Sequence, residues 1–492
     1  MRFARKSSQQ SLTTISKSPA PYMVPLLVLT WVVTSLVVVG VRRYAVWDEA
    51  IYLARGLGRP ESFGWGPSRA LGMPIVTSMV TWWQTTVVVA RVVVLIVNAC
   101  IAFLAITTWR RLVGSGALVG PALVLFSWVG LVYGSEILPN LLSGLLMLWS
   151  VGASWTWLVG GRRIDALAAV CAMTGLGLVR PTALVCMLLG SGVVALISRT
   201  VRVHAVRLFF GAVCVGTIAV TPWVIEAFVY FDNPVSRLRV ATPQADSFDI
   251  GDSATAFLWT LATEPVGSGM TLKTISLLAF LIVAAIVGVW AMQQKFGSRP
   301  DVGAPAETIL TGALHLAVAV GLSELVFYFL VPVSGHFTSS GVRFHLPALI
   351  LLSVPVGVGV VRVWPRRSGR VAVCLVAIPF IVLQLTAAHD ESEDLTIGRG
   401  RIRQLGAILE KNNVSAKCRF ESPKAWPVVQ LRSGCSGSRT TDPEQSFYRL
   451  DLEASDVTTF LLWEGQLEHP SNWSELELLI PGKWHIYVRS SD

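Results

Sequence analysis

Long apolar runs recur along most of this chain, and they constrain its fold more than any other feature. A helical run of about 20 apolar residues spans the hydrocarbon core of a bilayer, and a soluble domain rarely contains one. The residues are 53% hydrophobic and only 14% charged. These values argue against a soluble enzyme with one large core and predict an α-helical polytopic membrane protein.

The apolar runs predict about eleven transmembrane helices. Their expected bounds are Met23–Gly40, Thr85–Trp109, Ala117–Tyr133, Leu138–Val159, Ala166–Val179, Thr182–Ile197, Leu208–Val229, Thr274–Val289, Ile309–Val333, Leu346–Val363 and Val371–Ala388. The two short runs beside Arg180-Pro181 fit either two spans or one kinked span. Residues 1–21 are polar and basic, and no small-residue cleavage site follows them, so the first span is expected to remain as an anchor.

The distribution of basic residues predicts how the chain crosses the membrane. With the N-terminus in the cytosol, the only acidic residues of the cytosolic segments are Asp165, Asp301 and Glu307. The basic residues of these segments are Arg2, Arg5, Lys6, Lys17, Arg110, Arg111, Arg162, Arg163, Arg199, Arg202, Arg207, Lys295, Arg299, Arg362, Arg366, Arg367 and Arg370. Positive charge gathers on the cytosolic side of membrane proteins, and an odd number of spans then puts the C-terminus outside. The net charge of +10 is therefore read as a topology signal, with no nucleic-acid partner, and the composition, rich in Ala, Val, Gly and Arg, suggests a bacterial plasma membrane.

Every loop that this topology places outside the membrane contains a charged or titratable residue. The first, from about Val41 to Gln84, carries the adjacent acids Asp48 and Glu49. At helical spacing Asp48, Tyr52 and Arg55 fall on one face, although a loop with solvated charges fits the composition equally well. The other external loops are Gly134–Pro139 with Glu136, Arg180–Thr182, Tyr230–Lys273, and Ser334–His345 with His336 and Arg343. A functional site is therefore expected on the external side.

The polar C-terminal region predicts a separate domain. We expect a cytosolic segment at residues 1–21, a membrane domain at 22–388 and a small external α/β domain at 389–492. The expected elements of the last domain are a helix near Ile402–Lys411 and strands at Trp426–Leu431, Val457–Trp463 and Trp484–Val488. Cys418 and Cys435 lie in this domain, where an oxidising compartment allows a disulfide, and two free buried thiols are the alternative.

Five stretches of the membrane portion carry motifs in a consistent order. They are WDEAIYLARG (residues 47–56), SEILPNLLSGLLMLWS (Ser135–Ser150), LVRPTALVCMLLG (Leu178–Gly190), TPWVIEAFVYFDNPV (Thr221–Val235) and GVRFHLPALILL (Gly341–Leu352). They resemble, in turn, the aspartate-glutamate signature, second acidic loop, Arg-Pro-Thr turn, Pro-Trp exit and Arg-aromatic stretch of the GT-C membrane glycosyltransferases. That group includes the protein O-mannosyltransferases and the aminoarabinose lipid A transferases.

The resemblance implies a sugar transfer from a polyprenyl-phosphate donor on the external leaflet, with inversion at the anomeric carbon. The attacking hydroxyl of a lipid, glycan or protein acceptor must lose a proton, and Asp48 is the expected general base. Glu49 is a weaker catalytic candidate that could instead orient the loop. Arg343 and Arg180 are expected to bind the departing phosphate, because arginine offers a planar fork for phosphate oxygens. The alternative for both is an interfacial arginine.

Further residues complete the predicted site. Glu136 is a third acidic candidate, although an ordinary loop carboxylate is the alternative. Glu324 lies inside a predicted span, where an ionisable group needs a partner or a water-filled cavity. The other expected contacts are Arg55 and His336 to the phosphate, and Tyr52, Trp47 and Glu324 to substrate. Oxygen ligands from the three acids could hold a divalent metal, but no ligand-spaced motif supports one and no cofactor is predicted.

Two other functions compete with a glycosyltransferase. A membrane transporter or lipid flippase would show inverted repeats and charges in several spans, whereas one clear intramembrane acid and no internal repeat are found. A non-catalytic scaffold whose tail binds a partner leaves the acid pair unexplained. The sugar and the acceptor are left open by the sequence.

Overall fold

The structure is a computed structural model. It describes residues 22–43, 47–57, 69–81, 87–198, 201–241, 279–280, 282–283, 286, 304–330, 341–412, 417–422, 435–439, 457–464, 470, 472–476 and 484–489. These residues divide into two compact units. The first unit comprises the described residues of Met1–Gly40, Pro67–Met73 and Val92–Asp390, and the second those of Val41–Gly66, Pro74–Arg91 and Glu391–Asp492.

Helices make up most of the described chain. They are α2 (Met23–Thr34), η1 (Ser35–Val39), α3 (Trp47–Gly56), α4 (Gly72–Thr81), α5 (Val87–Val113), α6 (Gly116–Leu125), α7 (Trp128–Ser135), α8 (Pro139–Gly160), α9 (Arg163–Val179), α10 (Pro181–Ile197), α11 (Arg202–Tyr230), α12 (Pro234–Ala241), α15 (Ala304–Leu330), η3 (Gly341–His345), α16 (Leu346–Val363) and α17 (Arg367–Asn412). Within the described residues, 6 helices are long and apolar enough to cross a membrane, or 7 if one bent pair counts as a single span. The class predicted from the sequence, a polytopic helical membrane protein, is confirmed.

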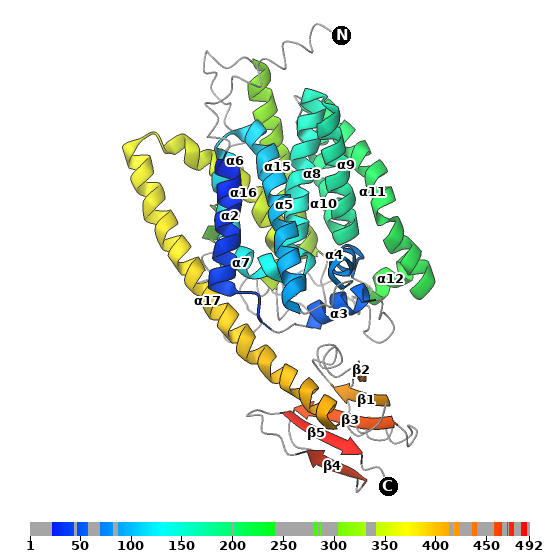
Figure 1. The fold of residues 1–492 in the computed structure, drawn as a ribbon. Coiled ribbons are helices and arrows are strands. Elements are labelled where there is room, and N and C mark those ends of the chain that lie inside the picture. Colours follow the sequence, from blue (N-terminus) through cyan, green and yellow to red (C-terminus); the bar gives the residue numbers. More distant parts are fainter. Residues whose placement is uncertain are drawn as a thin grey trace. The chain divides into compact units, whose positions relative to one another are not determined.

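The first unit is a bundle in which neighbouring helices form a closed ring of contacts. Helix α8 packs against α9, α9 against α11, α11 against α10, α10 against α15, α15 against α16, and α16 against α8 (Figure 1). Helix α6 joins the bundle through α16, where a Cβ atom on Gly120 or Gly357 would collide with the facing backbone. Small residues that let two backbones approach closely are a common device for packing helices in membranes.

The predicted spans coincide with helices wherever the structure describes them, with one correction. The run Ala117–Tyr133, expected to be one span, is broken into α6 and α7, which meet at an angle of 74°. Ser127 causes the break by capping α7, since its hydroxyl accepts a hydrogen bond from the backbone N–H of Gly130 (3.3 Å). The side-chain oxygen of Gln384 accepts another from the N–H of Trp128 (3.1 Å).

Three further predictions concern the runs beside Arg180-Pro181, the span Thr274–Val289 and the helix near Ile402–Lys411. The runs beside Arg180-Pro181 form two separate helices, α9 and α10, that both pack on α11. The predicted span Thr274–Val289 lies largely outside the described residues, so the total of eleven stays a prediction. The predicted helix at Ile402–Lys411 is confirmed, and it forms the end of α17, which runs without interruption from Arg367 to Asn412.

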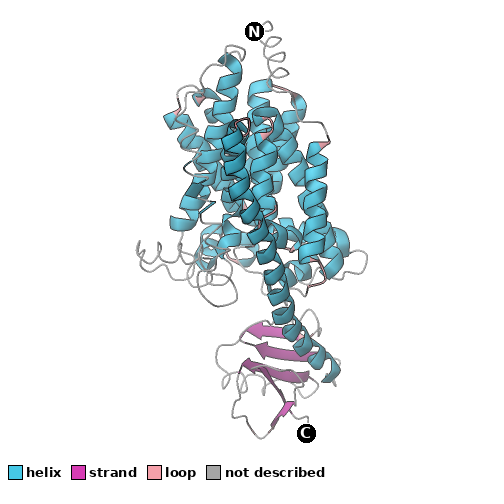
Figure 2. Cartoon of the chain, turned by 90° about the vertical axis from the view of Figure 1, so that its left-hand side faces the viewer, coloured by secondary structure: helices cyan, strands magenta, loops and turns pink. Residues whose placement is uncertain are grey.

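The C-terminal part of the second unit contains a mixed five-stranded sheet, as an α/β domain requires (Figure 2). Its strands are β1 (Lys417–Ser422), β2 (Ser436–Arg439), β3 (Val457–Glu464), β4 (Trp473–Leu476) and β5 (Trp484–Arg489), in the order β2-β1-β3-β5-β4. Strand β1 pairs in parallel with β2 and β3, whereas β5 is antiparallel to β3 and β4. The expected strand Trp426–Leu431 lies outside the described residues.

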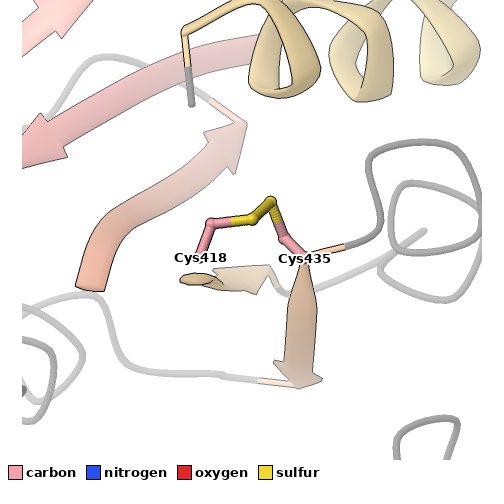
Figure 3. The surroundings of a disulfide bond; sticks show 2 residues. All are labelled: Cys418 and Cys435. Atoms are coloured by element: carbon pink, nitrogen blue, oxygen red, sulfur yellow. A yellow bond between two sulfur atoms is a disulfide. The ribbon is translucent and has the colours of Figure 1, made fainter. Parts of the chain in front are cut away.

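Apolar side chains and one disulfide hold this sheet together. Phe420 of β1 lies directly opposite Phe460 of β3, and both are fully buried with Leu409 of α17. A disulfide joins Cys418 of β1 to Cys435, directly before β2 (Figure 3). Of the two alternatives that the sequence left open for these cysteines, the structure has the disulfide.

Candidate functional site

The acid pair lies on a helix. Helix α3 begins at Trp47, with Asp48 and Glu49 in its first turn and Arg55 in its last turn. This placement of charges is favourable, because the N-terminus of a helix attracts negative charge and the C-terminus positive charge. Ala50, Ile51 and Leu53 are buried, so α3 is an amphipathic helix packed against its surroundings and not a loop of solvated charges.

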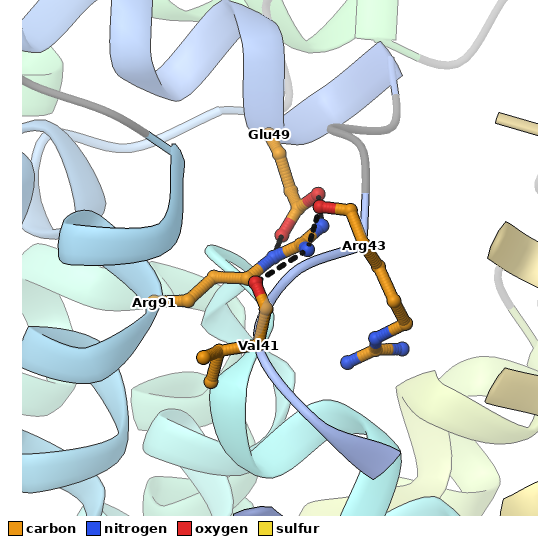
Figure 4. Close-up of polar contacts among 4 residues, drawn as sticks. All are labelled: Val41, Arg43, Glu49 and Arg91. Carbon is orange, nitrogen blue, oxygen red and sulfur yellow. Dashed lines mark hydrogen bonds and ion pairs between the residues drawn. The ribbon is translucent and has the colours of Figure 1, made fainter. Parts of the chain in front are cut away.

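Glu49 is fully buried and is bound by Arg91 (Figure 4). The Nε of Arg91, on α5, donates to Glu49 Oε1 (3.0 Å), and Arg91 Nη2 donates to Glu49 Oε2 (2.5 Å). The remaining nitrogen, Nη1, donates to the backbone oxygens of Arg43 and Val41 (3.4 Å to Val41). Both oxygens of the Glu49 carboxylate are therefore engaged in a two-point ion pair.

The predicted partners of the acids on α3 differ in burial. Asp48 and Arg55 are half-buried, whereas Tyr52 is only 6% exposed. The backbone oxygen of Tyr52 accepts a hydrogen bond from Thr77 Oγ1 on α4 (3.3 Å). A Cβ atom on Gly56 would collide with Thr77, so glycine at this position permits the close contact of α3 with α4. Trp47 is the first residue of α3, and its side chain is outside the description.

A second cluster of predicted residues lies in the first unit, where α9, α10, α15 and η3 converge. Arg180 is the residue between α9 and α10, and its guanidinium donates to the hydroxyl of Tyr328 on α15. The Cζ atoms of Arg180 and Arg343 lie 5.4 Å and 5.1 Å from the ring centroid of the same residue, Phe344. The structure therefore brings together the two arginines that were predicted to bind phosphate, on one aromatic surface.

A buried carboxylate belongs to this cluster. Glu324 lies one helical turn before Tyr328 on α15 and is fully buried. The charge of the Arg180 guanidinium and the Cys186 thiol on α10 both favour the charged form of its carboxylate. His345 is also buried here, and its ring lies 5.7 Å from that of Tyr328. Among the described residues neither carboxylate oxygen of Glu324 has a hydrogen-bond partner, so this buried acid is a candidate for contact with a bound molecule.

The other predicted residues lie elsewhere or outside the description. Glu136 is in the turn between α7 and α8 and is buried, at 2% exposure. The backbone of this turn is held by Asn98, whose Nδ2 donates to the oxygen of Gly134 (2.9 Å). His336 lies outside the described residues. Among the residues that are described, no group of three or more His, Cys, Asp or Glu side chains could hold a metal ion.

Several residues of these clusters were missed in the sequence. Arg91 was passed over although it lies inside the predicted span Thr85–Trp109, where a charge is a signal of function or pairing. Tyr328 could have been found as the residue four positions after Glu324, on the same helix face. Arg237 of α12 is another buried arginine, paired with Glu226 of α11 (3.3 Å), and the sequence did not indicate this pairing.

The comparisons with known proteins concern the fold. Neither protein-family models nor curated proteins match the sequence. The crystal structure of ArnT from Cupriavidus metallidurans bound to undecaprenyl phosphate is similar, with a TM-score of 0.60 and 13% identity over 96% of this chain and 98% of that one. The apo structure of the same ArnT gives a TM-score of 0.61 at 12% identity, over 94% and 97% of the two chains. At this level of identity the likeness establishes the fold, which is the GT-C fold that the motifs predicted.

Proposed function

We propose that this chain, a multi-pass membrane protein with the GT-C fold, is an inverting glycosyltransferase that moves a sugar from a polyprenyl-phosphate donor to a hydroxyl acceptor. The observation that carries the proposal is the likeness to ArnT, which extends over 96% of this chain and includes a structure with bound undecaprenyl phosphate. The charges of the loops support a reaction at the external face of the plasma membrane, with the N-terminus in the cytosol and the C-terminal domain outside.

Asp48 is the proposed general base. The acceptor oxygen forms a bond to the anomeric carbon while the bond from that carbon to the phosphate oxygen breaks. The hydroxyl proton passes to the Asp48 carboxylate, and polyprenyl phosphate leaves. The different environments of the two acids support this assignment, because Asp48 is half-buried whereas both oxygens of Glu49 are engaged by Arg91. Glu49 therefore fits the orienting role better than a catalytic one.

Arg180 and Arg343 are the proposed seat of the donor phosphate. Two guanidinium groups lie beside the Phe344 ring, one from Arg180 between α9 and α10 and one from Arg343 in η3. Their positive charge would stabilise a departing phosphate. Glu324 is proposed to act on substrate through this cluster, since its interactions are with Arg180 and Cys186. Arg55, Tyr52, Trp47, Glu136 and His336 keep their proposed substrate or phosphate contacts.

The test uses purified full-length protein in lipid nanodiscs. A panel of labelled polyprenyl-phosphate sugars is added with candidate acceptors, and release of polyprenyl phosphate is measured for the wild type, Asp48→Asn and Asp165→Asn. Asp165, in the first turn of α9, is a matched control, because it pairs with Arg111 of α5 and lies outside the clusters around Glu49 and Arg180. Release by the wild type and by Asp165→Asn, with loss in Asp48→Asn, supports the proposal. If the wild type releases no polyprenyl phosphate from any donor, the proposed function is contradicted. If EDTA abolishes the release, a metal-free reaction is contradicted.

One observation favours a second function. The break between α6 and α7 is a broken helix of the kind that transporters use to bind substrates. A transporter or lipid flippase would move the labelled donor across a vesicle bilayer without releasing polyprenyl phosphate. The same donor panel in vesicles therefore separates the two functions.

A further inference from the structure

We infer that Arg91 is a positioning residue of the reaction, one that fixes the acid helix α3 in place through Glu49 and so sets where Asp48 points. The inference rests on the proposed role of Asp48. Arg91 itself lies on α5, is fully buried and contacts Glu49 and two backbone carbonyls.

Arg91 ties together three stretches of the second unit (Figure 4). One edge of its guanidinium, formed by Nε and Nη2, holds the carboxylate in the first turn of α3. Its Nη1 donates to the backbone oxygens of Val41 and Arg43, in the segment that precedes α3. A single planar group on a long helix thus fixes both the start of α3 and the backbone that leads toward it.

Only arginine can make this set of contacts. The guanidinium presents five donors in a rigid fork, and the ion pair here uses two of them side by side. A lysine ammonium at the same place would be a point charge, able to reach Glu49 or the carbonyls but unable to hold the carboxylate plane. Arg91→Lys therefore keeps the charge and removes the orientation.

Stability alone does not explain such a pair. Burying two charges costs about as much as their attraction returns, and apolar replacements of similar volume are often as stable as a buried ion pair. What the pair supplies is a fixed direction for the first turn of α3. Asp48 is the neighbouring residue in that turn, and a misplacement of about 1 Å can lower a rate about 100-fold.

The test compares Arg91→Lys, the double variant Glu49→Leu/Arg91→Met, and a conservative control, Arg111→Lys, at the other end of α5. The double variant removes both charges at once, so it is expected to fold with a thermal midpoint near that of the wild type. The control residue is half exposed, at 47%, and forms a different ion pair, with Asp165. Each protein is examined in nanodiscs for kcat, for the donor KM and for hydrogen–deuterium exchange of residues 47–56.

Positioning predicts a fall in kcat of about 10- to 100-fold in Arg91→Lys and in the folded double variant, with a donor KM within about threefold of the wild type. Exchange across α3 rises in both, and Arg111→Lys behaves as the wild type. A kcat that stays normal in the folded double variant, or exchange that does not change, overturns the inference while the proposed function stands. If the wild type itself releases no polyprenyl phosphate, the proposed function fails, and the exchange of α3 alone then decides whether Arg91 positions this helix.

Discussion

Arg91 and Arg237 are two buried arginines of this chain whose charges are paired with a glutamate in different geometries. Each has a fully buried side chain, pairs with a glutamate and donates to backbone oxygens of another segment. Arg91 holds Glu49 at two points, 3.0 Å and 2.5 Å. Arg237 touches Glu226 only once, at 3.3 Å, and its Cζ lies 4.4 Å and 5.2 Å from the ring centroids of Trp223 and Phe231.

The difference shows what each arginine depends on. Both arginines also donate to two backbone oxygens, which are those of Trp223 (2.7 Å) and Arg69 (2.9 Å) for Arg237 and those of Val41 and Arg43 for Arg91, so the pairs differ in how the glutamate is held. The fork of Arg91 is directed at one carboxylate, and that carboxylate belongs to the helix that carries Asp48. Burial and pairing are therefore common to both arginines, and the two-point geometry beside Asp48, the proposed base, is what distinguishes Arg91.

The largest expected effect on kcat comes from Asp48, which neighbours the Glu49–Arg91 pair. Asp48→Asn keeps the size of the side chain but cannot accept the acceptor proton, so kcat should fall by about 10²- to 10⁴-fold. Steady-state release of polyprenyl phosphate measures it. Glu226→Gln, beside the second arginine, should leave kcat within about twofold of the wild type. Equal losses in the two variants would show that the two regions do not differ in function.

The second prediction compares the stability of the two pairs. Glu49→Gln leaves the buried Arg91 charge without its carboxylate, and breaking such a pair costs about 3–5 kcal/mol. Glu226→Gln weakens one longer contact (3.3 Å) that the amide oxygen of glutamine can still accept, and it should cost about 1 kcal/mol. Thermal unfolding in nanodiscs checks the order. A midpoint that drops more for Glu226→Gln would reverse the comparison.

A third arginine sharpens the contrast. Arg180 is held by the Tyr328 hydroxyl and lies 4.9 Å from that ring, in the cluster proposed to receive the donor phosphate. Arg180→Lys should raise the donor KM about tenfold, equivalent to about 1.4 kcal/mol of binding, with a smaller change in kcat. Arg91→Lys is expected to lower kcat and to leave the donor KM nearly unchanged, so KM and kcat measured together separate phosphate binding from positioning. An unchanged KM in Arg180→Lys would remove Arg180 from the proposed phosphate seat.

The smallest effect on turnover is expected from the C-terminal domain. The disulfide between Cys418 and Cys435 closes a loop with a sequence separation of 17, and its removal in Cys418→Ser/Cys435→Ser should destabilise the sheet by about 3 kcal/mol. Turnover at low temperature should stay within about twofold of the wild type. Limited proteolysis of the tail measures the first effect, and a large loss of kcat would implicate the domain in the reaction itself.

Local sequence patterns predicted the parts of this fold that depend on local physics. Helix α16 has the predicted bounds Leu346–Val363, because an apolar run flanked by polar residues sets the length of a membrane helix. The break at Ser127 was missed because a serine in an apolar run also fits a continuous helix, and only the contact with Gln384, distant in sequence, completes the cap. Strands β2 and β4 are only four residues each, and β2 has no apolar side chain, so no period-two pattern marked them.

The site was predictable to a similar extent. The order of charges in WDEAIYLARG indicated the helix and the acids, and the motifs indicated Arg180 and Arg343. The partner of Glu49 was not predictable, since Arg91 is 42 residues away and the pairing depends on how α5 packs. Tyr328 was missed although its spacing of four residues from Glu324 places both on one helix face.

The most direct measurement is a cryo-electron microscopy structure of the full chain with an unreactive analogue of the donor. A base that acts through the acceptor hydroxyl must lie about 3 Å from that oxygen, which in turn lies about 3 Å from the anomeric carbon. A carboxylate oxygen of Asp48 within about 6 Å of the anomeric carbon, on the side opposite the phosphate, is the expected result. Asp48 on the phosphate side, or more than about 10 Å from the anomeric carbon, would contradict its role as the base.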